Sequence, residues 1–207
     1  MSASTRSNAV SGRVRGQLAN QVGNPTPVVA ALLFAACCIA FPRPALAAAP
    51  PLPAMVTALA PDLRLLGGGE MRMLGWSVYD GWYWADTREF STAQPFALDL
   101  HYHRALDGAR IAERSVAEIE KLGYGTPAER SRWAAAMKAI FPSVDKGDRL
   151  TGVNLPALGV RFFHNGRPIG DVADPSFARA FFGIWLDPRT SRPDFRARLL
   201  GLVDGTR

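Results

Sequence analysis

The sequence FALDLHYHRALDGARIAERSVAEIEKL, residues 96–122, changes its hydrophobic period part-way along. Over residues 96–104, large apolar side chains alternate with smaller or polar ones, which predicts a β-strand with one buried face. Over residues 107–122, apolar side chains recur at helical spacing with Glu and Arg between them. The side chains expected on the buried face of the strand are Phe96, Leu98, Leu100 and Tyr102.

The other face of this strand carries Ala97, Asp99, His101 and His103, and we expect it to meet solvent. Two histidines separated by one residue can hold a metal ion. No further ligand is close in the sequence, and His164 is the only other histidine. This short and common pattern therefore does not predict a metal site.

The flanking sequence predicts a sheet with helices on one face. Residues 63–86 are rich in Val, Trp and Tyr, as strands are, but Gly67-Gly68-Gly69 and Gly81 interrupt them. Asn165-Gly166 is a strong signal for a two-residue hairpin, and Asp174 with Pro175 is typical of a helix start. We expect further helices over 127–141, 174–186 and 194–200, and strands over 149–155, 160–164 and 167–172. The fold class is α+β, with helices packed on a largely antiparallel sheet.

The first 47 residues are typical of a cleavable secretory signal. Residues 1–27 hold three arginines and no acid, an apolar run of 14 residues follows over 28–41, and Ala45-Leu46-Ala47 offers a cleavage site. The run is shorter than the roughly 20 residues that cross a bilayer, which favours cleavage over an uncleaved anchor. We therefore expect a periplasmic protein with a flexible lead-in over 48–61 and one domain over 62–207.

Cleavage after Ala47 would change the charge and the cysteine content. Four of the 24 basic residues and none of the 18 acids precede that site, so the remaining chain has a net charge of +2. This small excess argues against a nucleic-acid partner. Cys37 and Cys38 would also be removed, which leaves no cysteine for a disulfide.

Five segments, in this order, resemble the bacterial exported branch of the chalcone isomerase-like proteins. They are LLGGGEMRMLGWSVYDG (65–81), ERSVAEI (113–119), FPSVDKGDRLTGVNLP (141–156), GVRFFHNGRPIGDVADPSFARAFFGIWLDPRTS (159–191) and RARLLG (196–201). The resemblance covers residues 63–201. It implies an open-faced β-sandwich, in which a large antiparallel sheet is covered by helices and a ligand cleft lies between sheet and helices.

The family includes plant enzymes that close a chalcone to a flavanone and non-catalytic relatives that hold fatty acids. If the Gly before the first long helix matches Gly108, the enzyme's Tyr and Asn fall on Ile111 and Glu118, which do not keep that chemistry. The resemblance therefore implies a binder of an amphipathic ligand, such as a fatty acid or an aromatic acid, with no catalytic residue and no cofactor.

Two other functions stay open. The first is an isomerase or lyase that acts on a planar unsaturated substrate, with Tyr79 and Arg72 as acid and anion stabiliser. The second is an envelope interaction module, which predicts a filled core and an exposed apolar patch.

The aromatic cluster over 76–84 is either part of a ligand cleft or sheet core. Tyr79 is the best candidate for a pocket because a buried hydroxyl needs a partner. Arg72, two residues after Glu70, is either paired, exposed or available to an anionic ligand. The expected ligand-binding residues are Arg72, Trp76, Tyr79, Tyr83 and Tyr102.

Overall fold

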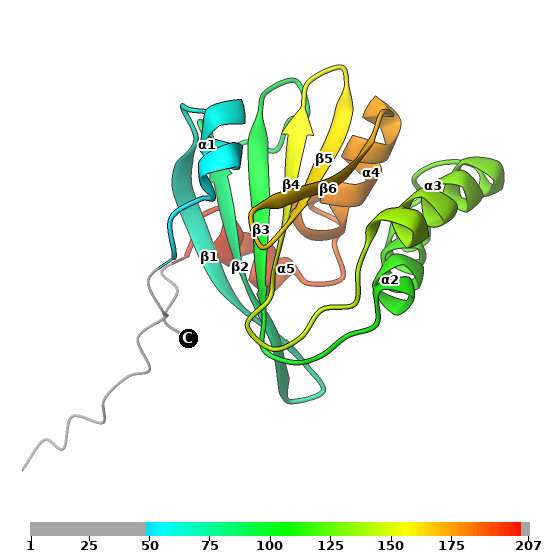
Figure 1. Ribbon diagram of the computed structural model, residues 1–207, viewed down its shortest axis with the longest axis horizontal. Coiled ribbons are helices and arrows are strands. Elements are labelled where there is room, and N and C mark those ends of the chain that lie inside the picture. Colours follow the sequence, from blue (N-terminus) through cyan, green and yellow to red (C-terminus); the bar gives the residue numbers. More distant parts are fainter. Residues whose placement is uncertain (1–48, 204–207) are drawn as a thin grey trace, which may run out of the picture. The chain divides into compact units, whose positions relative to one another are not determined.

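The computed structural model describes residues 49–203, in which six strands form one antiparallel sheet (Figure 1). The strands are neighbours in the sheet in the same order as in the sequence. The expected α+β class, a large open antiparallel sheet covered by helices, is confirmed. The elements are α1 (Ala54–Leu59), β1 (Arg64–Met73), β2 (Trp76–Ala85), β3 (Phe96–Tyr102), α2 (Gly108–Lys121), α3 (Pro127–Ile140), β4 (Arg149–Leu155), β5 (Gly159–His164), β6 (Arg167–Val172), α4 (Pro175–Leu186) and α5 (Pro193–Leu199).

One face of the sheet packs against α2 to α5 and forms the main core. The expected buried face of β3 is confirmed, and the ring of Phe96 lies 4.6 Å from that of Phe182 in α4. The carboxylate of Asp174 accepts hydrogen bonds from the backbone N–H groups of Ser176 and Phe177, which fixes the start of α4 as expected. Because α4 is apolar on nearly all sides, it is buried along most of its length.

The opposite face of β3 does not meet solvent, contrary to the expectation from its alternation. Ala97 and Asp99 are fully buried. Helix α1 lies over this face, where the fully buried Val56 joins a second small core with Ala97. The segment expected as a loose lead-in therefore contains a helix that packs on the sheet, because Val56, Leu52 and Leu59 cover side chains that would otherwise be exposed.

Asp99 is tolerated in this second core because its charge is fully paired. Arg149 on β4 donates to its two carboxylate oxygens from Nε at 2.8 Å and Nη2 at 2.6 Å, and Thr151 donates at 2.7 Å. Arg149 also donates from Nη1 to the carbonyl of Pro51 at 3.0 Å, which ties the segment before α1 to the sheet. Burial opposes ionisation of Asp99, but hydrogen bonds from His101 and Arg149 outweigh it and hold the pKa of this carboxyl below its usual value.

The glycine run of β1 does not interrupt the strand. β1 continues through residues 67–69 and pairs with β2 on either side of them. A Cβ at Gly67 would overlap the carbonyl oxygen of Arg198 at the end of α5. The glycines therefore let the backbone of α5 lie directly on β1.

The expected hairpin at Asn165-Gly166 is confirmed: φ is positive at both residues, and His164 pairs with Arg167. Within residues 49–203, no helix has the length and apolar character needed to cross a bilayer. The expected signal, residues 1–47, lies outside the described residues.

Candidate functional site

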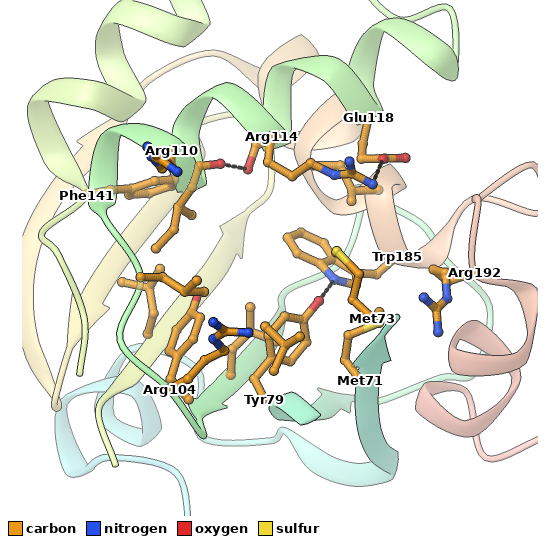
Figure 2. A pocket seen from close by; sticks show the side chains of 18 of the residues that line it. Met71, Met73, Tyr79, Arg104, Arg110, Arg114, Glu118, Phe141, Trp185 and Arg192 are labelled. Atoms are coloured by element: carbon orange, nitrogen blue, oxygen red, sulfur yellow. Dashed lines mark hydrogen bonds and ion pairs between the residues drawn. The ribbon is translucent and has the colours of Figure 1, made fainter. Parts of the chain in front are cut away.

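A cavity of about 600 Å³ lies between the sheet and the helices α2 and α4 (Figure 2). This volume is within the roughly 300–1,000 Å³ of small-molecule sites. Helix α2 turns Ile111, Ser115 and Glu118 toward it, and α4 contributes side chains from both ends of its apolar FFGIW segment. The buried and half-buried apolar lining consists of Met71, Val78, Tyr79, Leu100, Tyr102, Leu106, Ile111, Phe141, Leu150, Phe181, Ile184 and Trp185.

Two tyrosines bring hydroxyl groups into this apolar space. The hydroxyl of Tyr79 accepts a hydrogen bond from Nε1 of Trp185 at 2.9 Å, so its own proton is left to donate. The ring of Tyr102 lies edge-on to that of Tyr79, with centroids 5.7 Å apart. Among residues 49–203, neither hydroxyl donates a hydrogen bond to a protein group. Burial raises the pKa of Tyr79 to about 12, so this phenol keeps its proton at neutral pH.

Four arginines line the cavity, and two of them have no acidic partner in the described chain. Arg114 contacts Glu118 at 2.5 Å, and Nε of Arg192 lies 3.7 Å from Asp194. Arg104 and Arg110 are exposed, and neither side chain forms an ion pair or hydrogen bond with any other residue of 49–203. The edge of the cavity is therefore positive.

Glu118 is the acidic group of the lining, and it stays ionised. Its nearly buried carboxylate accepts hydrogen bonds from Lys121 at 3.0 Å and from Ser191 at 2.9 Å, and it pairs with Arg114. Burial disfavours the ionised form of Glu118, but the hydrogen bonds from Lys121 and Ser191 have the larger effect and hold the pKa of Glu118 below its usual value. At neutral pH Glu118 therefore has no proton to give to a bound molecule.

Residues 53–201 match the family described as chalcone isomerase-like. The chain belongs to the chalcone isomerase-like family. A fatty-acid binding protein of Arabidopsis thaliana has a similar fold, with a TM-score of 0.52 and 14% identity over 68% of this chain and 88% of that protein. An uncharacterized protein of Haemophilus influenzae is 28% identical over 137 residues, which are 66% of this chain and 67% of that protein.

In this chalcone isomerase-like chain, Ile111 and Glu118 both line the cavity. These are the two positions that the resemblance matches to the Tyr and the Asn of the plant enzyme. An isoleucine can neither hold a water molecule nor donate a proton, and Glu118 is occupied by its basic neighbours. If that match holds, the cavity has neither the Tyr nor the Asn of the enzyme at these two positions.

Three of the five residues predicted from the sequence line the cavity, and two do not. Tyr79 and Tyr102 lie within it, and Trp76 lies at its exposed edge. Arg72 is outside: it pairs with Glu70 at 3.0 Å and donates to the carbonyl of Gly75 at 3.1 Å. Tyr83 shares the sheet face of Tyr79 but lies further along β2, where its ring packs 5.6 Å from that of Phe96 in the main core.

The sequence-based prediction missed the arginines of the lining and Trp185. A usable signal is present in α2: Arg110 and Arg114 are four residues apart and directly precede Ile111 and Ser115, which line the cavity at the same spacing. Trp185 lies within the apolar run of α4, where the sequence pattern alone does not distinguish residues that line a cavity from residues of a filled core.

The two histidines of β3 are held by different carboxylates. Nε2 of His101 lies 3.1 Å from Asp99, and Nε2 of His103 lies 3.1 Å from Asp80. Within residues 49–203, no group of three or more histidine, cysteine or acidic side chains is arranged to hold a metal ion.

Proposed function

We propose that this chalcone isomerase-like protein is a non-catalytic binder of one amphipathic molecule with an anionic head group, such as a fatty acid. The observation that carries the proposal is Tyr79, a half-buried phenol with a free proton in an apolar cavity edged by arginines. The apolar part of the ligand fills the cavity, and its carboxylate accepts a hydrogen bond from Tyr79. The fatty-acid binding protein of Arabidopsis thaliana, which shares the fold, supports this choice of ligand.

Arg114 and Arg192 complete the head-group site in this proposal. Both side chains line the same cavity as Tyr79, and their positive charges favour an anion bound in it. An isomerase that uses Tyr79 with Arg72 has no such support, because Arg72 pairs with Glu70 outside the cavity. An interaction module without a ligand predicts a filled core, whereas this domain has a cavity of about 600 Å³.

Native mass spectrometry of the protein, purified gently from the periplasm, tests the proposal most directly. We expect a retained adduct that extraction identifies as a long-chain acid. An empty protein that also fails to bind any member of a fatty-acid panel would show that the carrier proposal is wrong.

Tyr79→Phe should weaken the binding of palmitate about tenfold or more. A hydrogen bond to a charged group contributes roughly 1.5–3 kcal/mol, and each 1.4 kcal/mol is a factor of about ten in affinity. Calorimetric titration of both proteins with palmitate measures the change. Tyr83→Phe is the matched control, since Tyr83 is buried on the same strand but outside the cavity. Equal affinities for Tyr79→Phe and wild type would exclude Tyr79 from the head-group site.

We also propose that the protein acts in the periplasm after residues 1–47 are removed. The support is the order of basic segment, apolar run and small-residue site in the sequence. N-terminal sequencing of the protein from the periplasmic fraction should begin at Ala48. A chain recovered from the membrane fraction with its apolar run intact would contradict export by cleavage.

A further inference from the structure

The turn between β1 and β2 exposes three large apolar side chains at one point of the surface. Met73 is 41% exposed, Leu74 is 94% exposed and Trp76 is 68% exposed. We call these three residues the hairpin tip. In Figure 1 the β1–β2 turn projects beyond the neighbouring strands at one end of the sheet. All three residues also line the edge of the cavity, so the tip lies beside its opening.

The backbone conformation of this turn does not favour a leucine at position 74. Leu74 has φ of 50° and Gly75 has φ of 84°, so both central residues of this two-residue turn are left-handed. Such turns favour Asn or Asp before Gly, because a larger apolar residue is strained at this position. Leu74 therefore occupies an unfavourable conformation without burying its side chain.

Positive charge accompanies the hairpin tip. His103, just after β3, donates its backbone N–H to the carbonyl of Val78 near the start of β2, which brings Arg104 to the same end of the sheet. Arg104 and Arg110 line the cavity together with the tip and are unpaired within the described residues. The carboxylates of this end have partners of their own: Asp80 pairs with His103, and Asp107 caps α2.

We infer that the hairpin tip docks the protein on an anionic lipid bilayer, with Leu74 and Trp76 in the acyl region and Arg104 and Arg110 at the head groups. Tryptophan and leucine beside basic residues form the pattern of interfacial anchors. Three side chains are far fewer than the 20–30 residues that each partner brings to a standard protein interface. The inference rests on the proposed function, since a carrier of a membrane-derived acid must bring its cavity opening to a bilayer.

Co-sedimentation with vesicles tests the inference. The processed protein should sediment with vesicles of phosphatidylcholine and phosphatidylglycerol, and much less with phosphatidylcholine alone or at high salt. Leu74→Asn should weaken vesicle binding about tenfold, because the apolar insertion is lost. Thermal melting of Leu74→Asn should match or exceed that of wild type, since Asn-Gly suits this turn better.

Two further variants separate the apolar and the charged contributions. Leu158→Asn removes a leucine that is also exposed but lies in the β4–β5 turn at the opposite end of the sheet, and it should bind vesicles like wild type. Arg104→Gln combined with Arg110→Gln should weaken binding to the anionic vesicles roughly thirtyfold and remove most of the salt dependence.

The outcomes distinguish this inference from the proposed function. Wild-type protein that binds palmitate in solution but does not sediment with anionic vesicles overturns the docking inference alone. Protein that sediments as expected but takes up no palmitate overturns the proposed function instead. Leu74→Asn that sediments like wild type, or that changes only the self-association of the protein without vesicles, also overturns the docking inference.

Discussion

Asp99→Asn is expected to lower the free energy of unfolding by about 3 kcal/mol, because removing one partner of a buried ion pair leaves the other uncompensated. Asp99 is fully buried, and Arg149, whose side chain is only 15% exposed, would lose its carboxylate. For a domain of this size, the melting temperature should fall by roughly 10 °C. Chemical denaturation at neutral pH measures the energy, and calorimetry measures the temperature.

Asp171→Asn is the matched control. Arg161 donates to Asp171 through two nitrogens at 2.8 and 2.7 Å, as Arg149 does to Asp99, but this pair is solvent-exposed. We expect a loss below about 1 kcal/mol. If the two substitutions cost the same, burial of the Asp99 pair is not what stabilises the sheet.

The cost of Asp99→Asn should depend on pH. The pKa of Asp99 in the folded protein lies below 3.8, its ordinary value in an unfolded chain. The ionised carboxylate therefore contributes its full stabilisation when the pH is above 3.8. This stabilisation is lost as the pH falls through the folded-state pKa. The difference between wild type and variant should therefore be constant near neutral pH and shrink below about pH 4. A difference that grows on acidification would contradict this assignment.

Gly67→Ala is expected to destabilise the domain by about 3 kcal/mol. The added methyl group would meet the backbone of residues 198–201, which cannot rotate away as a side chain can. Either α5 must lift from β1 or the strand must bend, and both changes lose buried apolar contacts of Phe195 and Leu199. Denaturant unfolding of the purified variant measures the loss.

Gly69→Ala provides the comparison for this prediction. Gly69 points to the same face of β1 two residues later, but the atoms nearest to its added methyl group all belong to the flexible side chain of Arg198. We expect a change within about 1 kcal/mol. Similar losses at Gly67 and Gly69 would mean that α5 does not pack on β1 through its backbone.

The elements of the fold could be predicted because their signals are local. The alternation over residues 96–102 identified β3 and its core face, and Asn165-Gly166 identified a hairpin. The second core could not be predicted, because the partner of Asp99 is 50 residues away and a lone acid on a strand is typical of a solvent face. The expectation that the glycines interrupt β1 is wrong for a similar reason, since α5, which packs on them, is more than 120 residues away in the sequence.

The candidate site was predicted in part. Tyr79 and Tyr102 belong to strands whose inward face the alternation identifies, and both line the cavity. Arg72 faces away because side chains alternate along β1, and its two neighbours Met71 and Met73 are the ones that line the cavity. Arg110 and Arg114 share α2, but only tertiary packing brings Arg104 and Arg192 to the same cavity.

The packing of α5 on β1 also affects how quickly the chain can fold. The first strand of the sheet depends on the last helix, and Arg198 donates to the carbonyl of Glu70 across 128 residues at 3.3 Å. The entropy of closing so long a loop is lost before these contacts form, which slows folding. During synthesis β1 has no α5 to cover it until residues 193–199 have been made, so this part of the polypeptide stays incompletely folded over that time.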